Sequence, residues 1–208
     1  LIPLMKLRMA EVPHLIDLQS ISELTGIESG STIRIGAMTT QADIIDNASL
    51  ASTAPILKEA SLQIADPQVR YMGTVGGNVA NGDPGNDMPG LMQCLDATFI
   101  LRGPNGEREV KARDFYHAAY MTEREDDEVM VAVTFDAPKG GYAYEKQKRK
   151  IGDYATAAAA VIISKDGSKC KEASIAMTNL SDTPVFCGAA SDCLIGTSVS
   201  AEDIKNAV

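Results

Sequence analysis

The feature that most constrains this sequence is a glycine-rich stretch at residues 66–90. It holds six of the chain's 17 glycines and three of its nine prolines. A stretch of this length and composition is more than a connector between packed elements, and such loops are usually functional or disordered. Apolar residues spaced along it favour an ordered loop; they are Val69, Val75, Val79 and Met88.

The centre of this stretch reads G-T-V-G-G-N, from Gly73 to Asn78. Glycine lets a ligand approach the main chain closely. Consecutive backbone amides in such a loop can converge on an anion, so a diphosphate can be held without lysine. Thr74 and Asn78 add side-chain donors. On composition alone the segment is either a structural tight turn or a phosphate-binding loop.

The overall charge limits the kinds of ligand. The formal net charge is −9, with 45% apolar and 23% charged residues, which is typical of a globular protein. A nucleic-acid groove needs a basic stripe, so this partner class is excluded. We therefore expect any anionic ligand to be held mostly by backbone amides or helix ends.

Several other functional classes lack their motifs. The sequence has no G-x-x-x-x-G-K-[ST], no H-E-x-x-H and only two histidines, His14 and His117. The four cysteines lack C-x-x-C spacing, which predicts reduced thiols and neither zinc nor an iron–sulfur cluster. No run of about 18 apolar residues could span a membrane. Hydrolytic catalysis is poorly supported.

The hydrophobic pattern predicts an α+β fold of two packed units. Thr40 is expected to cap a short helix, and Ser20 with Glu23 has capping-box spacing for another. Further helices are expected at 55–64 and 91–95. Alternation and turn residues predict strands at 15–18, 31–38, 97–101, 108–110, 129–135, 157–164 and 173–179.

The glycine-rich stretch also carries a family resemblance. From Ile64 to Pro89 the chain reads I-A-D-P-Q-V-R-Y-M-G-T-V-G-G-N-V-A-N-G-D-P-G-N-D-M-P. This segment resembles the second FAD-binding motif of the flavoprotein (medium) subunits of molybdenum hydroxylases. That motif has A-D-x-Q-V-R, then T-[IV]-G-G-N, then an aspartate nine residues beyond the asparagine, which here is Asp87.

The resemblance extends to both sides of this motif. The segment 15–18 is similar to the family's L-I-D-L strand, and 33–40 to its I-R-I-G-A-x-T-T. Residues 113–116 (R-D-F-Y) resemble the start of its C-terminal domain, and 144–155 its Y-x-K-x-x-R-[RK]-x-G-D-[YW]-A loop. The wording G-N-D-M-P and M-Q-C-L-D-A is closest to the carbon monoxide dehydrogenase branch.

The resemblance implies a fold and a division of the chain. It implies an FAD-binding domain of the PCMH (vanillyl-alcohol-oxidase-like) type over residues 1–110. A smaller α+β domain, like the C-terminal domain of the CO dehydrogenase flavoprotein, would follow over 111–208, with an antiparallel sheet and helices. The family's first motif, A-G-G-x-[SD]-L, would immediately precede Leu1, so we expect the sequence to be cut from a longer chain at both ends.

Individual positions carry over as cofactor contacts. The resemblance implies that the segment from Thr74 through Val75, Gly76 and Gly77 to Asn78 wraps the FAD diphosphate with backbone amides. The other implied contacts are Ile64, Asp87, Met130, Lys146 and Tyr154, the last beside the isoalloxazine ring.

Each side chain also has a structural alternative. Asp87 could be a helix N-cap. Lys146 could belong to a solvated basic patch or a subunit contact. Tyr154 and Met130 could be ordinary core residues.

The implied function is electron transfer. A large molybdopterin-binding subunit and a small [2Fe-2S] subunit would be partners, in a dimer of heterotrimers, with a quinone or NAD as acceptor. The protein would be cytoplasmic or peripheral at the inner face of the membrane. The alternatives are a flavin-free scaffold subunit of the same fold, which the missing first motif favours, and a self-contained FAD oxidase.

Overall fold

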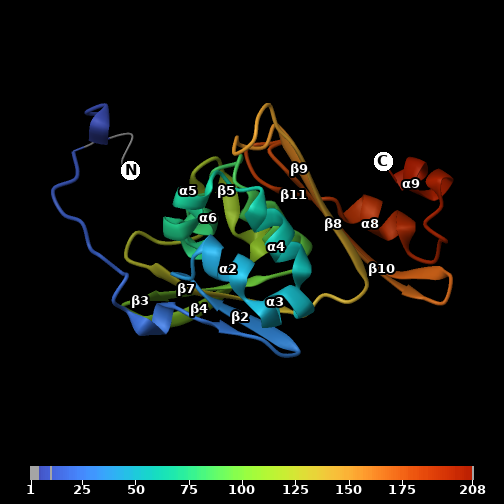
Figure 1. Cartoon of the computed structure of the whole chain (residues 1–208), viewed down its shortest axis with the longest axis horizontal. Coiled ribbons are helices and arrows are strands. Elements are labelled where there is room, and N and C mark those ends of the chain that lie inside the picture. Colours follow the sequence, from blue (N-terminus) through green and yellow to red (C-terminus); the bar gives the residue numbers. More distant parts are fainter. Residues whose placement is uncertain (1–4, 10, 208) are drawn as a thin grey trace.

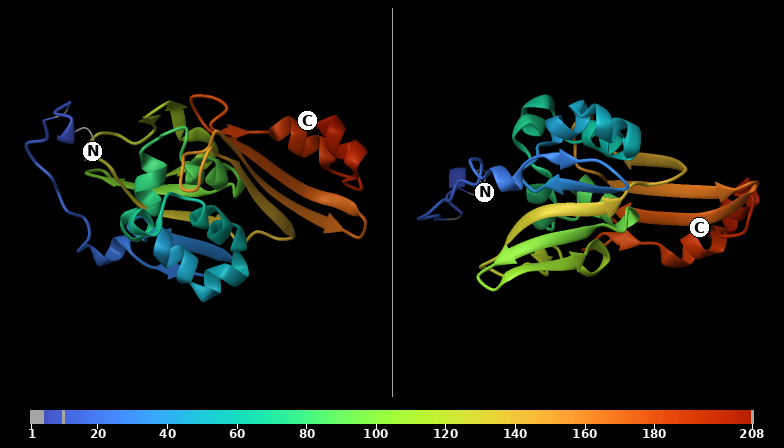
Figure 2. Two further views of the ribbon diagram at one scale, coloured as in Figure 1. Left: turned by 45° about the horizontal axis from the view of Figure 1, so that its top comes forward. Right: turned by 90° about the horizontal axis from the view of Figure 1, so that it is seen from below.

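Two antiparallel sheets organise the chain in the computed structural model (Figure 1), which describes residues 5–9 and 11–207. Residues 1–4, which directly follow the position expected for the family's first motif, lie outside this range. The architecture is α+β, as the sequence predicts. Figure 2 shows helices on one face of the first sheet and the second sheet extending away beside it.

The first sheet has the strand order β1-β2-β7-β3-β4, and every neighbouring pair is antiparallel. Its hairpin β3–β4 turns at Pro104-Asn105, as predicted, and β7 runs down the middle of the sheet. The strands are β1 (Ile27–Glu28), β2 (Thr32–Gly36), β3 (Thr98–Gly103), β4 (Gly106–Lys111) and β7 (Val129–Asp136).

Five short helices cover one face of this sheet: α2 (Gln41–Asp46), α3 (Ala48–Thr53), α4 (Pro55–Leu62), α5 (Pro67–Met72) and α6 (Val75–Ala80) (Figure 1). Side-chain caps start most of them. Thr40 forms a capping box with Asp43, and Asp66 and Thr74 cap α5 and α6. These caps satisfy backbone donors that helices of six residues would otherwise leave free.

The prediction of a loop over 66–90 is therefore wrong in its backbone form, because α5, α6 and the start of α7 (Asp87–Cys94) occupy much of it. The strand expected at 15–18 is also absent. Leu15 and Ile16 lie in an irregular exposed segment with no neighbouring strand to pair with, and Ile16 is 86% exposed. Ser20 caps nothing; a 3-10 turn, η1 (Ser22–Leu24), starts at Ile21 without a side-chain cap.

The second sheet has the order β11-β10-β9-β8 and is also antiparallel. The predicted hairpin through Asp166-Gly167 joins its two longest strands. The elements are β8 (Gly141–Gln147), β9 (Ala157–Asp166), β10 (Lys169–Thr178), β11 (Val185–Phe186), α8 (Gly188–Leu194) and α9 (Ala201–Ala207). A small ladder of β5 (Tyr116–Ala118) and β6 (Met121–Thr122) follows the 3-10 turn η2 (Ala112–Asp114) after the first hairpin.

The sheets also suggest where to divide the chain. The expected boundary at 110/111 precedes β7, but β7 pairs with both β2 and β3 in the first sheet. The chain passes to the second sheet between Asp136 and Gly141. We therefore propose a division within residues 137–140.

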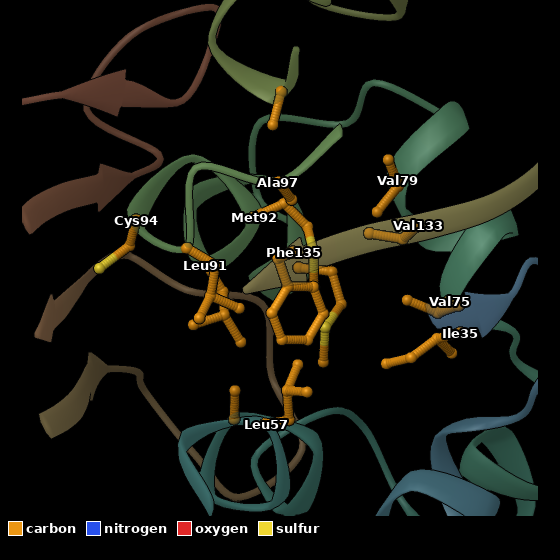
Figure 3. Close-up of a cluster of buried hydrophobic side chains, with 14 of the residues drawn as sticks. Ile35, Leu57, Val75, Val79, Leu91, Met92, Cys94, Ala97, Val133 and Phe135 are labelled. Carbon is orange, nitrogen blue, oxygen red and sulfur yellow. The ribbon is translucent and has the colours of Figure 1, made fainter. Parts of the chain in front are cut away.

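Helix α7 packs between the two sheets. All eight of its residues are buried, and it contacts β9 and β10 on one side. Figure 3 shows Leu91 and Met92 of α7 beside Phe135 of β7, with Leu57 of α4 approaching the same cluster. A short helix whose residues are all buried has to be covered by other elements on every side. This core thus joins the two units into one packed body.

The close contact of α7 with the second sheet depends on Gly90. A Cβ at this position would lie 2.2 Å from Oγ1 of Thr178, which is itself buried. Because Thr178 is buried and branched at Cβ, any other rotamer moves its hydroxyl or its methyl group into the packed core, so making room is costly.

We expect Gly90→Ala to destabilise the protein by about 1–3 kcal/mol, since overpacking forces the helix from the sheet. Urea unfolding would measure this. Gly30→Ala is the matched control, because its Cβ would meet only the Thr32 carbonyl at 3.6 Å. Adding Thr178→Ala should recover part of the loss, and an additive double variant would contradict this account of the contact.

Candidate functional site

The G-T-V-G-G-N segment forms the start of α6. Thr74 is the N-cap, and its Oγ1 accepts the Gly77 amide at 3.1 Å. The Asn78 amide donates to the Thr74 carbonyl, while the amides of Val75 and Gly76 donate to the carbonyls of Thr39 and Ala37 at 3.0 and 2.9 Å. The expectation that the amides from Thr74 to Asn78 form a bare cradle is therefore wrong for the last four of these residues, because their amides are already paired within the protein.

The two adjacent glycines have different roles. Gly76 is buried, and a Cβ there would lie 2.5 to 2.9 Å from atoms of Ala37, so its absence lets α6 pack against the end of β2. Gly77 is exposed, and its Cβ would approach only Oγ1 of Thr74, at 2.9 Å. Gly76 is thus required by the fold, whereas Gly77 leaves the outer face of α6 bare.

Donors on this outer face come from side chains. The Thr74 hydroxyl accepts the Gly77 amide and keeps its own proton for a ligand. Asn78 uses its carbonyl oxygen on the Met88 amide, at 3.3 Å, and its Nδ2 donates to no acceptor among the described residues. The two side chains expected to assist the backbone are therefore the groups with hydrogen-bonding capacity to spare.

Hollows lie at both ends of α6. The hollow at its N-terminus, about 210 Å3, we call the N-terminal hollow; its lining is Gln19, Thr25, Met38, Thr40, Tyr71, Met72 and Thr74. The hollow beside the chain that leaves α6, about 460 Å3, we call the tyrosine hollow; its lining is Asp83, Pro84, Gly85, Ala119, Tyr120, Tyr154 and Asn179. A helix of six residues is about 9 Å long, so one extended ligand can reach both.

The tyrosine hollow combines two aromatic side chains with one carboxylate. Tyr154 is 63% exposed and Tyr120 64%, so the alternative of Tyr154 as a core residue does not hold. The Tyr154 ring packs on Gly85, where a Cβ would lie 3.1 Å from it. The Asp83 carboxylate raises the pKa of Tyr120, and burial together with Asp83 raises that of Tyr154. Both phenols therefore keep their protons at neutral pH.

Asp87 and Lys146 form a buried ion pair between the two units. Their side chains are 5% and 1% exposed, and Lys146 Nζ lies 2.9 Å from Asp87 Oδ2. Tyr144 donates its hydroxyl to Asp87 Oδ1 at 2.5 Å. Lys146 also donates to the Gln63 carbonyl at 3.2 Å. Asp87 is the first residue of α7 and not its N-cap, which is Asn86, and Lys146 is not in a solvated patch.

Burial raises the pKa of the Asp87 carboxyl, and the hydrogen bonds from Tyr144 and Lys146 oppose that rise. The geometry gives the carboxylate both of its partners, so we take the pair as ionised. A pair of this kind adds little net stability, but the loss of one member leaves the other charged and buried.

The remaining expected contacts lie elsewhere. Met130 is a buried core residue of β7, so the structure favours its structural alternative. Ile64 is buried at the turn between α4 and α5, and its carbonyl accepts from Arg70 Nη1 at 2.8 Å. The next residue, Ala65, supports the 150–154 loop, because a Cβ at Gly152 would lie 2.8 Å from the Ala65 carbonyl. The turn after α4, in which Ile64 is buried, thus contacts the segment that carries Tyr154 through Ala65.

Sequence reasoning missed Tyr120, Asp83 and Tyr144. Tyr144 stands two residues before Lys146 on β8, so the period of a strand could have placed both on one face. Asp83 could have been found from the sequence, because it lies inside the glycine-rich stretch that was already singled out. Tyr120 had none, because β5 and β6 bring it to Gly82 through a distant contact, its amide donating to the Gly82 carbonyl at 2.7 Å.

Comparison with known proteins agrees with this architecture. The family model for the FAD binding domain in molybdopterin dehydrogenase matches residues 1–138. The model for the CO dehydrogenase flavoprotein C-terminal domain matches 142–208. The chain belongs to the flavoprotein-subunit family of molybdenum hydroxylases.

Relatives within this family share most of the chain. It is 54% identical to the carbon monoxide dehydrogenase medium chain of Afipia carboxidovorans, over all of this chain and 73% of that protein. It is 31% identical to the xanthine dehydrogenase FAD-binding subunit of Escherichia coli, over 84% of this chain and 62% of that protein. A crystal structure of the Cu,Mo-CO dehydrogenase in its cyanide-inactivated form superposes with a TM-score of 0.96 at 54% identity, and the match covers 100% of this chain and 73% of that one.

FAD is the cofactor of this flavoprotein family, whose members are subunits of oxidoreductase complexes with large and small partner subunits. The site described above fits it: FAD is a long molecule with an aromatic group at each end and a diphosphate between. No helix of the described residues has the length and apolar character to cross a membrane. No three His, Cys, Asp or Glu side chains in that part of the chain are grouped to bind a metal.

The buried pair yields a stability prediction. Lys146→Met should cost about 3–5 kcal/mol, because the Asp87 carboxylate stays buried without its cation. Combining it with Asp87→Asn should cost less than the sum of the two single changes. Lys150→Met, at an exposed site on the adjoining loop, is the control and should shift stability by less than about 0.5 kcal/mol. Equal unfolding midpoints for Lys146→Met and the control would refute this description of the pair.

Proposed function

We propose that this protein is the electron-transfer flavoprotein subunit of a molybdenum hydroxylase complex of the carbon monoxide dehydrogenase type. It takes electrons from the [2Fe-2S] clusters of the small subunit and passes them to a quinone. Bound FAD supplies the redox chemistry, and the protein binds, orients and shields it. The observation that carries the proposal is the bare outer face of α6, at Gly77, between a hollow at either end.

Binding along α6 assigns work to particular groups. The Thr74 hydroxyl and the Asn78 amide nitrogen donate to the diphosphate, and Gly77 allows its close approach. The flat ring system lies in the tyrosine hollow against Tyr154, and Asp87 and Lys146 act from beneath by holding the surrounding segments. Ile64 contributes through the turn it occupies. No described residue needs to act as a general acid or base on the molybdenum subunit's substrate.

The charge of the tyrosine hollow favours a quinone over NAD. Its lining contains the Asp83 carboxylate and, among the described residues, neither Lys nor Arg. An NAD molecule approaching the bound flavin would bring its diphosphate towards this carboxylate, which repels it, whereas a quinone is neutral and meets no such repulsion. Quinones dissolve in the membrane, so we propose that the complex, a dimer of heterotrimers, works at the inner face of the cytoplasmic membrane.

The two glycines allow a matched test of FAD binding. Gly77→Val should reduce flavin content at least tenfold with the fold retained, because its side chain points into the ligand's space. Gly76→Ala should instead lower the unfolding temperature, because its Cβ meets the Ala37 backbone. Absorbance near 450 nm and thermal unfolding of the purified complex separate the two effects. A Gly77→Val protein with full flavin content would argue against this binding face.

The acceptor assignment has its own test. Asp83→Asn removes one negative charge from the tyrosine hollow, so kcat/KM for an anionic acceptor such as ferricyanide should rise about fivefold, the effect of about 1 kcal/mol. The value for a neutral quinone should stay within about twofold. Asp126→Asn, an exposed acidic site elsewhere, is the control. If NAD is reduced faster than the quinone by the wild-type complex, the quinone proposal is wrong.

A flavin-free scaffold subunit is the second candidate. The internal pairing of the amides from Val75 to Asn78 favours it, because it removes the donors expected to hold a diphosphate. A purified complex without the flavin absorbance bands would establish the scaffold and refute electron transfer.

A further inference from the structure

Tyr144 joins the two walls of the tyrosine hollow through Asp87. On one side, Asp87 follows directly after the loop that supplies Asp83, Pro84 and Gly85 to the lining. On the other, Tyr144 lies on β8, and the chain that continues through residues 148–153 carries Tyr154, whose ring packs on Gly85. The hydrogen bond between Tyr144 and Asp87 therefore links the loop that contains Gly85 to the strand that leads to Tyr154.

The tie is rigid because every group in it has a partner. Asp87 accepts from Tyr144 on one oxygen and from Lys146 on the other, and Lys146 also bonds the last turn of α4 through the Gln63 carbonyl. Lys148, one residue beyond the end of β8, donates to Gln63 Oε1 at 2.9 Å. Tyr144 and Lys146 on β8, together with Lys148, thus fix this strand against the first unit.

The same tie reaches the outer face of α6. Asn86, just before Asp87, donates its Nδ2 to the Asn78 carbonyl at 2.9 Å, and the Met88 amide, just after, donates to Asn78 Oδ1 at 3.3 Å. The residues on both sides of Asp87 therefore orient Asn78. A displaced Asp87 would shift the Asn78 side chain and the Gly85 wall together.

We infer that Tyr144 is a positioning residue of the cofactor site, which keeps Gly85 in contact with the Tyr154 ring by holding Asp87 in place. The residue touches neither wall itself and acts only through the carboxylate. Its hydroxyl is the removable part, since the ring is buried and packs with the core. This inference rests on the FAD binding proposed above.

The direct test is Tyr144→Phe in the assembled complex, which deletes one hydroxyl and keeps the ring. We expect the dissociation constant of FAD to rise about tenfold and flavin fluorescence to increase, because a Tyr154 ring that has lost its contact with Gly85 stacks less well on the flavin. Tyr142→Phe is the matched control: the same change two residues earlier on β8, at a hydroxyl that bonds no described residue. It should leave both quantities unchanged.

A second variant separates positioning from plain stability. In an Asp87→Ala background no side-chain oxygen remains to accept from the Tyr144 hydroxyl, so adding Tyr144→Phe should change the dissociation constant by less than twofold. A residue that only stabilises the fold would lower the unfolding temperature and leave the fluorescence of the bound flavin at the wild-type value. That result, or equal flavin affinity in Tyr144→Phe and Tyr142→Phe, overturns the inference. A wild-type complex that binds no flavin overturns the proposed function instead.

Discussion

The buried contact of α7 with both sheets is the constraint on which the rest depends. Gly90 lets this helix lie against Thr178 of β10, and its other faces fill the core beside β7 and α4. Its first residue, Asp87, then meets Lys146 and Tyr144 of β8. One helix thereby fixes the distance between the sheets. It also places the Asp87 carboxylate where Lys146 and Tyr144 of β8 can both donate to it.

Electrostatics divides the site into a buried part and an exposed part. The buried Asp87–Lys146 pair is costly to break and hard to reach, so it maintains geometry. The exposed part consists of Thr74, Asn78, Gly77, two tyrosines and Asp83. Of these residues only Asp83 carries a charge. In a chain of net charge −9, an anionic ligand has to be held by neutral donors, and a neutral partner meets less repulsion than a second anion.

Local patterns predicted the elements that local interactions create. Alternation and turn residues gave the β3–β4 and β9–β10 hairpins, and Thr40 marked the start of α2. The helices within 66–90 escaped prediction because six residues are too few for a periodic signal and glycine disfavours helix. Neither the central position of β7 nor the contact of Tyr144 with Asp87, 57 residues apart in the sequence, follows from neighbouring residues. The sequence pointed to Asp87 and Lys146 as cofactor contacts, which stays a prediction, and it did not predict that they form a buried pair.

The pairing of the α6 amides bears on how the mature protein is made. Val75, Gly76, Gly77 and Asn78 satisfy their backbone hydrogens against Thr39, Ala37 and Thr74. This turn consequently has its final shape before any nucleotide binds, so the cofactor does not have to order the polypeptide when it is inserted. Maturation can then proceed in two steps, in which the polypeptide folds first and binds its flavin afterwards.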